Sequence, residues 1–135
     1  MKTIVQVLPS LVQGGVETEV LAVADYLKTK GVENIVISNG GPLVAQLQKK
    51  GIIHIQMPVH TKNPFKMILN GFRLIRVVKK YHVGLFHVHS RAPAWSVRIA
   101  SSLSKVPFIS TYHGLYGLHP KIKKIYNRVM LKGLC

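Results

Sequence analysis

The sequence predicts an α/β fold, a doubly wound parallel sheet with helices on both faces. Apolar runs of strand length alternate with amphipathic helical segments through five units. The chain has 135 residues, enough for one domain with a closed hydrophobic core. Hydrophobic residues make up 47% of the chain and charged residues 17%, which excludes a disordered tail. We therefore expect one parallel sheet in a single domain.

The first unit is a strand at residues 3–8 (TIVQVL), followed by the loop PSLVQGG and a helix at 16–30. Gly31 ends this helix at the C′ position, where glycine is favoured. Apolar residues recur along the helix every three or four positions, at Val16, Val20, Val23, Ala24 and Leu27. The spacing predicts a buried stripe on an amphipathic helix.

The later units follow the same order. We expect strands at 34–38, 52–57, 83–87 and 107–111, and helices at 42–50, 65–80, 92–103 and 119–131. The helix at 65–80 has one apolar face, made by Phe65, Ile68, Phe72, Ile75 and Val78. In folds of this kind ligands bind at the carboxyl ends of the strands. The candidate site loops are therefore PSLVQGG, HVHSRAPAW and TYHGLYGLHP.

The charge is distributed very unevenly. The net charge is +15, and all four acids lie within the first 33 residues. The basic remainder must attract an anion, such as nucleic acid, an anionic membrane or a phosphorylated substrate. It also lacks the acids that paired-carboxylate, two-metal and Ser-His-Asp sites need. The one cysteine excludes a disulfide scaffold and a cysteine-based zinc site.

Two basic clusters stand out in this remainder. One comprises Lys62, Lys66, Arg73, Arg76 and Lys80, close to one face of the 65–80 helix. The other comprises Lys121, Lys123, Lys124, Arg128 and Lys132, interleaved with apolar residues. Basic amphipathic helices suit an anionic membrane surface, and a solvated helix face is the plainer interpretation. The sequence leaves both interpretations open.

The pair Gly14-Gly15 opens the first helix. Glycines at a helix N-terminus let a phosphate approach free N–H groups, although a turn pair without a ligand explains them equally well. The pattern is neither G-x-G-x-x-G nor a Walker loop, and no acid ends the second strand, so dinucleotide binding is disfavoured.

Histidines mark the ends of the last two strands. We expect His87 and His89 to point to opposite faces, one packed and one toward the crevice. A metal site would need a third ligand that nothing local supplies, so no metal is expected. His113 lies in the cluster Thr111-Tyr112-His113-Gly114, where its alternative role is a loop histidine bonded to backbone.

The segments LPSLVQGGVETEVLAVADYLKTKG and FHVHSRAPAWSVRIASSLSKVPFISTYHGLYG together resemble the N-terminal half of GT-B glycosyltransferases of family 4. The resemblance covers nearly the whole chain. It implies the Rossmann-like, acceptor-side domain of a retaining, metal-independent enzyme that uses a nucleotide-sugar donor. Gly14 and Gly15 would then face the donor's diphosphate and sugar, and His113 the transferred sugar. The acceptor side would comprise His89, Ser90, Arg91 and Tyr112.

One departure from the family pattern is important. The family's second half carries a Glu-x7-Glu signature that holds the donor, whereas the last acid here is Glu33. We therefore expect residues 1–135 to be a single incomplete domain that is inactive without a donor-binding half. A separately encoded donor-binding half is one candidate partner. A truncated gene, a split gene or a deliberately shortened chain would each give this sequence.

The sequence thus predicts an enzyme domain that transfers sugar to an envelope glycan or lipid-linked acceptor, as in lipopolysaccharide synthesis. MKTIVQVLPS does not read as a signal peptide, so we expect the cytoplasm, at the inner face of the cytoplasmic membrane. The alternatives are a non-catalytic remnant or binding module and, on charge only, a nucleic-acid-binding domain. Nucleic acid is not an expected partner because no recognised module is present.

Overall fold

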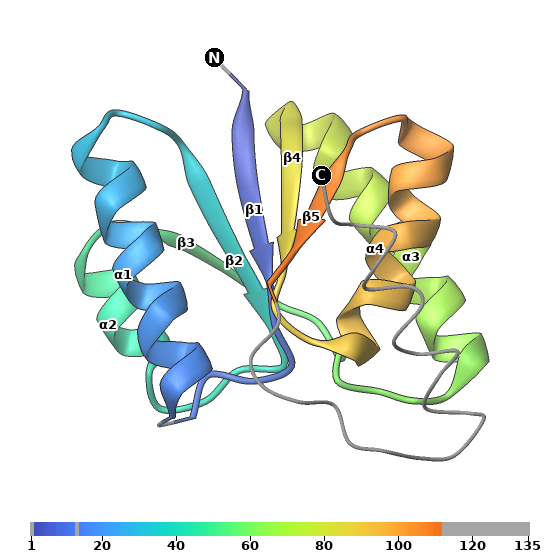
Figure 1. Cartoon of the computed structure of the whole chain (residues 1–135), viewed down its shortest axis with the longest axis horizontal. Helices are drawn as coiled ribbons and strands as arrows, with labels where there is room; N and C mark the ends of the chain where they lie inside the picture. The colour runs from blue at the N-terminus through green and yellow to red at the C-terminus, as the bar shows by residue number, and fades with distance from the viewer. Residues whose placement is uncertain (1, 13, 112–135) are drawn as a thin grey trace.

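A computed structural model describes residues 2–12 and 14–111, and within them a five-stranded parallel sheet is the centre of the fold (Figure 1). The strand order is β3-β2-β1-β4-β5. In chain order the strands are β1 (Thr3–Val7), β2 (Asn34–Ser38), β3 (Ile53–Gln56), β4 (Val83–Val88) and β5 (Phe108–Ser110). The order steps outward from β1 in both directions, as in a doubly wound sheet. The predicted fold class is confirmed.

Helices cover both faces of this sheet. They are α1 (Gly15–Thr29), α2 (Val44–Lys49), α3 (Pro64–Tyr81) and α4 (Arg91–Ser104). Helices α1 and α2 lie on one face, and α3 and α4 lie on the other (Figure 1). Every predicted element up to residue 111 is present within a few residues of its expected bounds. The helix predicted at 119–131 lies outside the described residues.

The core has two parts because successive strand residues face opposite sides of the sheet. Val5 and Val7 of β1 pack toward α3 and α4, with Phe86 and Leu74. Leu8 packs toward α1 and α2, with a second set of buried residues. The glycine predicted to end α1 does so: Gly31 has a φ of 71°, and the following N–H donates to the Leu27 carbonyl.

The face of α3 that packs on the fold is not the one its largest apolar residues predict. The buried residues are Met67, Asn70, Gly71, Leu74 and Val77. Of the apolar face expected from the sequence, Phe65, Ile68 and Phe72 are exposed. Its other two members, Ile75 and Val78, are partly buried against the core.

Small and polar residues explain this choice of face. The Asn70 amide donates to the Pro58 carbonyl at 2.9 Å, and Ser96 Oγ donates to the Met67 carbonyl at 3.0 Å. Gly71 lets α4 approach closely, since a Cβ there would lie 2.7 Å from Ile99 Cγ2. Helix α3 therefore packs on α4 and on the β3–α3 loop through these small and polar residues, and its aromatic residues Phe65 and Phe72 are left exposed.

The start of α3 is well defined. Asn63 is the N-cap, and its Oδ1 accepts hydrogen bonds from the backbone N–H groups of Phe65 and Lys66. Pro64 follows at the first helical position, where its missing N–H costs nothing. Within the described residues, no helix is both long enough and apolar enough to span a membrane.

Candidate functional site

The candidate site is the edge of the sheet where β1, β4 and β5 end. These strands are neighbours and all parallel, so their carboxyl ends lie together at one edge. Helices α1 and α4 begin there, and each directs the positive end of its dipole toward that edge. The edge therefore favours an anionic ligand.

Gly14 and Gly15 form the start of α1. Gly14 is the N-cap residue, and its carbonyl accepts from the N–H of Thr18 at 3.1 Å and from Thr18 Oγ1 at 2.7 Å. Because Gly14 has no side chain to cap the helix, the first N–H groups of α1 are left for water or a ligand. The Glu17 carboxylate lies beside Gly14, so an arriving phosphate would have to displace it.

Gly15 is not required by the fold. It is exposed, and a Cβ built on it would meet no atom within 4 Å. Neither glycine has a backbone angle in the left-handed region, where glycine is favoured. A side chain at position 15 would therefore point into open space at the edge of the sheet. The structure places this backbone where a ligand can approach it.

His89 follows β4 and is buried, with 1% of its surface exposed. Its Nε2 lies 3.0 Å from Oε1 of the buried Gln6, whose Nε2 donates to the Val20 carbonyl. Since an amide oxygen can only accept, the His89 Nε2–H donates to Gln6. His89, predicted on the acceptor side, is thus tied through Gln6 to helix α1.

His87 and His89 lie on the same side of the sheet. Their ring centroids are 4.0 Å apart, and His87 bonds Thr111 Oγ1 at the end of β5. The expectation that they point to opposite faces is wrong, because the side chains of residues two apart in a strand share a face. Of the two, His89 is packed and His87 is half-buried.

The other predicted site residues are distributed as follows. Ser90 is the N-cap of α4 and Arg91 its first residue, both half-buried at the same edge. Tyr112 and His113 lie outside the described residues. So does the second basic cluster, Lys121, Lys123, Lys124, Arg128 and Lys132. The first basic cluster is exposed in and before α3.

A second polar contact, which the sequence analysis missed, lies where β2 ends. Ser38 Oγ is 2.7 Å from His54 Nε2, and it also accepts from the Gly40 N–H at 3.0 Å. Burial lowers the pKa of His54 below its ordinary value, because the charged imidazole loses solvation. The sequence offers one signal for this contact: Ser38 and His54 are polar residues within two consecutive apolar runs that are predicted to be strands.

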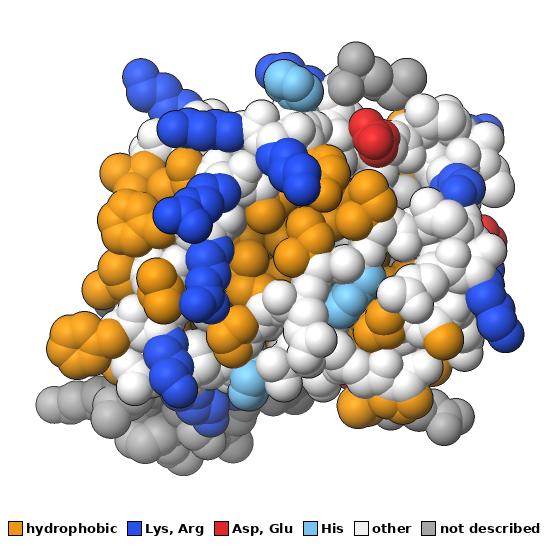
Figure 2. All heavy atoms as spheres, turned by 180° about the vertical axis from the view of Figure 1, so that it is seen from behind, with side chains coloured by type: hydrophobic (Ala, Val, Ile, Leu, Met, Phe, Trp, Pro, Cys, Tyr) orange, Lys and Arg blue, Asp and Glu red, His pale blue; other side chains and the backbone are white. Residues whose placement is uncertain are grey.

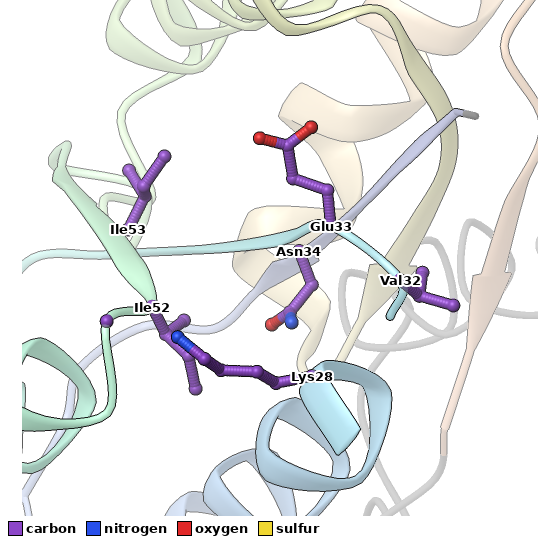
Figure 3. Close-up of a pocket in the computed structure, with 7 residues that line it drawn as sticks. Lys28, Val32, Glu33, Asn34, Ile52 and Ile53 are labelled. Carbon is purple, nitrogen blue, oxygen red and sulfur yellow. The ribbon is translucent and has the colours of Figure 1, made fainter. Parts of the chain in front are cut away.

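A small cavity lies at the other edge of the sheet (Figure 3). It has a volume of about 140 Å³ and is lined by Lys28, Val32, Glu33, Asn34, Gly51, Ile52 and Ile53. In Figure 3 the side chains of Glu33 and Asn34 point in opposite directions, so they do not form one binding group. Among residues 2–12 and 14–111, no three His, Cys, Asp or Glu side chains gather as metal ligands would.

Comparison with known proteins gives consistent matches. The family model for Glycosyltransferase Family 4 matches residues 13–134. A glycosyltransferase from Rickettsia africae ESF-5, known as a crystal structure, is 46% identical, with a TM-score of 0.83. That alignment covers 98% of this chain and 35% of the Rickettsia chain. No curated protein matches.

More distant structures share the fold. MurG of Acinetobacter baumannii is 17% identical, with a TM-score of 0.68 over 96% of this chain and 39% of that one. Anabaena Alr3699/HepE, crystallised with UDP-glucose, is 15% identical, with a TM-score of 0.74 over 96% of this chain and 35% of that one. This chain thus spans little more than a third of the length of any of these three proteins.

The five-stranded parallel sheet, the family match over residues 13–134 and the 46% identity to the Rickettsia enzyme agree with one another. The chain belongs to glycosyltransferase family 4 and has the Rossmann-like fold found in GT-B glycosyltransferases.

Proposed function

We propose that this chain is the acceptor-side part of a retaining glycosyltransferase. The enzyme takes a sugar from a nucleotide-sugar donor and transfers it to an envelope glycan or a lipid-linked acceptor, as in lipopolysaccharide synthesis. The observation that carries the proposal is the open space at Gly15, at the start of α1. A glycine that the fold does not need, placed at a helix N-terminus, is what close approach of a diphosphate requires.

The donor meets the chain at this helix start. Its diphosphate accepts hydrogen bonds from the first N–H groups of α1, and the helix dipole adds to the attraction. One distant structural relative, Alr3699/HepE, was crystallised with UDP-glucose, which makes a nucleotide-sugar donor reasonable here. The rest of the donor is held by a second half, which carries the acids that this chain lacks.

The acceptor side is formed by the segment that follows β4 and by the residues after β5. Ser90 and Arg91 stand at the start of α4, where Arg91 supplies a positive charge for an anionic acceptor. His89 is buried against Gln6, so it supports this surface from the interior and does not contact the acceptor directly. Tyr112 and His113 are assigned by resemblance only, with His113 beside the transferred sugar.

In the transfer, the bond from the anomeric carbon to the donor's phosphate oxygen breaks. A bond from the same carbon to the acceptor's hydroxyl oxygen forms, and the hydroxyl proton passes to the departing phosphate. The helix N-terminus stabilises the negative charge that grows on that phosphate. No metal is part of the proposed reaction. The two halves close around the donor to exclude water, so this chain by itself is inactive.

The test is a transfer assay with two polypeptides. The chain is mixed with the part of the Rickettsia enzyme that lies outside its alignment with this chain, which is the donor-binding part under this proposal. The aligned part is 46% identical to this chain. Radiolabelled nucleotide sugars are offered together with an envelope lipid extract. We expect labelled lipid only when both polypeptides are present. Transfer by this chain in the absence of the second polypeptide would show that the assignment to an acceptor-side part is wrong.

A matched pair of variants tests the site itself. Gly15→Val fills the space above the helix N-terminus and should lower transfer on the order of 100-fold. Ala22→Val places a valine at another exposed position, two turns further along α1. This variant should leave transfer unchanged. Both variants should melt like the parent chain. Equal transfer by the two variants would contradict the donor assignment.

A further inference from the structure

Helix α3 carries an exposed apolar surface that neither the fold nor the proposed transfer uses. We define the outer face of α3 as Phe65, Ile68, Leu69 and Phe72, which are 83%, 47%, 49% and 53% exposed. Their spacing puts them on one side of the first two turns. Four of the eight exposed large apolar residues in the described part of the chain thus lie within residues 65–72. A cluster this dense indicates an interaction surface.

Positive charge surrounds this face. Exposed basic residues in and just before α3 are Lys62, Lys66, Arg73, Arg76, Lys79 and Lys80. Figure 2 shows the result: a row of Lys and Arg side chains runs beside and among the apolar ones. The sequence contains no acid after Glu33, and Glu17, Glu19 and Asp25 are on α1 in the opposite helix layer. The α3 layer therefore presents apolar and cationic groups together.

Few classes of partner would bind exposed apolar and cationic side chains at the same time. A second copy of this chain would bring two cationic surfaces together and be repelled. Nucleic acid would neutralise the charges, and its bases could stack on the two exposed Phe rings. Ile68 and Leu69 lie between those rings in the chain and offer no aromatic face, so nucleic acid would use only half of the apolar face. An anionic bilayer takes both groups, because its headgroups attract Lys and Arg and its acyl boundary accepts apolar side chains.

We propose that the outer face of α3 inserts shallowly into an anionic membrane surface, with the flanking Lys and Arg residues on the headgroups. The sequence suggested only an electrostatic contact, and the structure adds an apolar one. Helix α3 begins at the same edge of the sheet as the candidate site, because it follows β3 in a parallel sheet. This inference rests on the proposed function. Membrane binding through α3 places the acceptor side next to the bilayer that holds a lipid-linked acceptor.

Vesicle binding tests the proposal without any sugar transfer. The chain is sedimented with vesicles of phosphatidylcholine, or of phosphatidylcholine mixed with phosphatidylglycerol, at low and at high salt. We expect binding to the anionic vesicles only, with a part that persists at high salt because apolar insertion is not screened. Phe65→Ser and Phe72→Ser should each weaken binding roughly tenfold, by removing apolar contact with the acyl region. The matched control is Tyr26→Ser, which removes a 61% exposed ring from α1 and should change nothing.

The charges are tested separately. Arg73→Gln and Arg76→Gln should each weaken binding at low salt roughly fivefold, equivalent to about 1 kcal/mol per charge near an anionic surface. Insertion is read directly with Phe72→Trp, whose fluorescence should be quenched by brominated lipids. Binding that vanishes at high salt, or no quenching, would overturn the insertion.

Other results would assign the face to a different partner and equally overturn the proposal. These are tighter binding to RNA than to anionic vesicles, or a dimer that Phe72→Ser disrupts. The outcome is independent of the transfer assay: vesicle binding without transfer would contradict only the proposed function, and transfer without vesicle binding only the membrane face.

Discussion

Two residues of α3 that lie two positions apart, Phe72 and Leu74, provide a direct test of how this helix packs. Phe72 is 53% exposed, whereas Leu74 is completely buried against the sheet. Amphipathicity by residue type predicts the opposite, since Phe72 belongs to the apolar face expected from the sequence. Replacing each residue with alanine therefore separates the two interpretations in one comparison.

The expected effects differ severalfold. Leu74→Ala removes a fully buried side chain and leaves a cavity, so it should lower the free energy of unfolding by about 2–5 kcal/mol. If Phe72 were buried, Phe72→Ala would cost about 3–5 kcal/mol. In the structure about half of the ring is already in water, and alanine is the better helix former, so the cost should be below about 1 kcal/mol.

The assay is thermal and urea unfolding followed by circular dichroism. A loss of 3 kcal/mol should lower the melting temperature by roughly 10 °C in a chain of this size. Leu74→Ala should show a shift of that order, and Phe72→Ala only a few degrees at most. The slope of the urea transition should stay the same in both variants, which would show that the unfolded states are comparable.

An equal or larger loss in Phe72→Ala would refute this account of α3. It would mean that the aromatic face is packed in solution, and the proposed membrane face would then have no exposed ring to insert. A small loss in both variants would instead show that Leu74 is not in a tight core.

The remaining predictions concern one close helix contact and one histidine. Gly71→Ala gains about 1 kcal/mol in helix propensity and loses about 1–3 kcal/mol by crowding Ile99, so we expect a net loss near 1 kcal/mol in urea unfolding. Ile99→Ala should relieve the crowding, and strictly additive losses in the double variant would contradict the contact. For His54, the unfolded chain takes up a proton at a higher pH than the folded chain does, because burial lowers the folded pKa. Stability should therefore fall as the pH drops through about 6.5, and His54→Gln should flatten that part of the pH profile; an unchanged profile would argue against the burial.

The fold could be predicted because two periodicities alternate so regularly. The runs TIVQV and NIVIS are almost wholly buried, as strands at the centre of a parallel sheet must be. Gly31 and Gly51 end helices α1 and α2 with positive φ angles, as their positions in the sequence predict. These are local signals, and they depend little on how the helices pack.

The buried face of α3 could not be read in the same way. Hydrophobicity ranks Phe65 and Phe72 as core residues and Asn70 and Gly71 as surface residues. The packing reverses that order, because Asn70 bonds the Pro58 carbonyl and Gly71 admits Ile99. Such contacts depend on residues about 12 to 28 positions away in the sequence, which a pattern within one helix does not contain.

The sequence predicts at which end of the sheet the candidate residues lie, and it predicts few of the contacts that they make. Strands β1, β4 and β5 are parallel neighbours, so their carboxyl ends lie at one edge, as a parallel sheet requires. The link from His89 through Gln6 to α1 was missed, although a glutamine inside an apolar strand is a signal for a buried polar contact. The contact of Ser38 with His54 was missed because it depends on the register between β2 and β3.

The two proposals also constrain one another through the helix layers. The start of α1 and the start of α3 are at the same edge of the sheet, but the two helices cover opposite faces (Figure 1). A chain bound to a bilayer through α3 would therefore hold Gly14 and Gly15 on the side of the sheet away from the lipid. A nucleotide sugar is water-soluble and charged, so it would reach the glycine pair from solution without crossing the headgroup region. The acceptor would come from the membrane side, and the sheet edge between the two helix starts is where the substrates would meet.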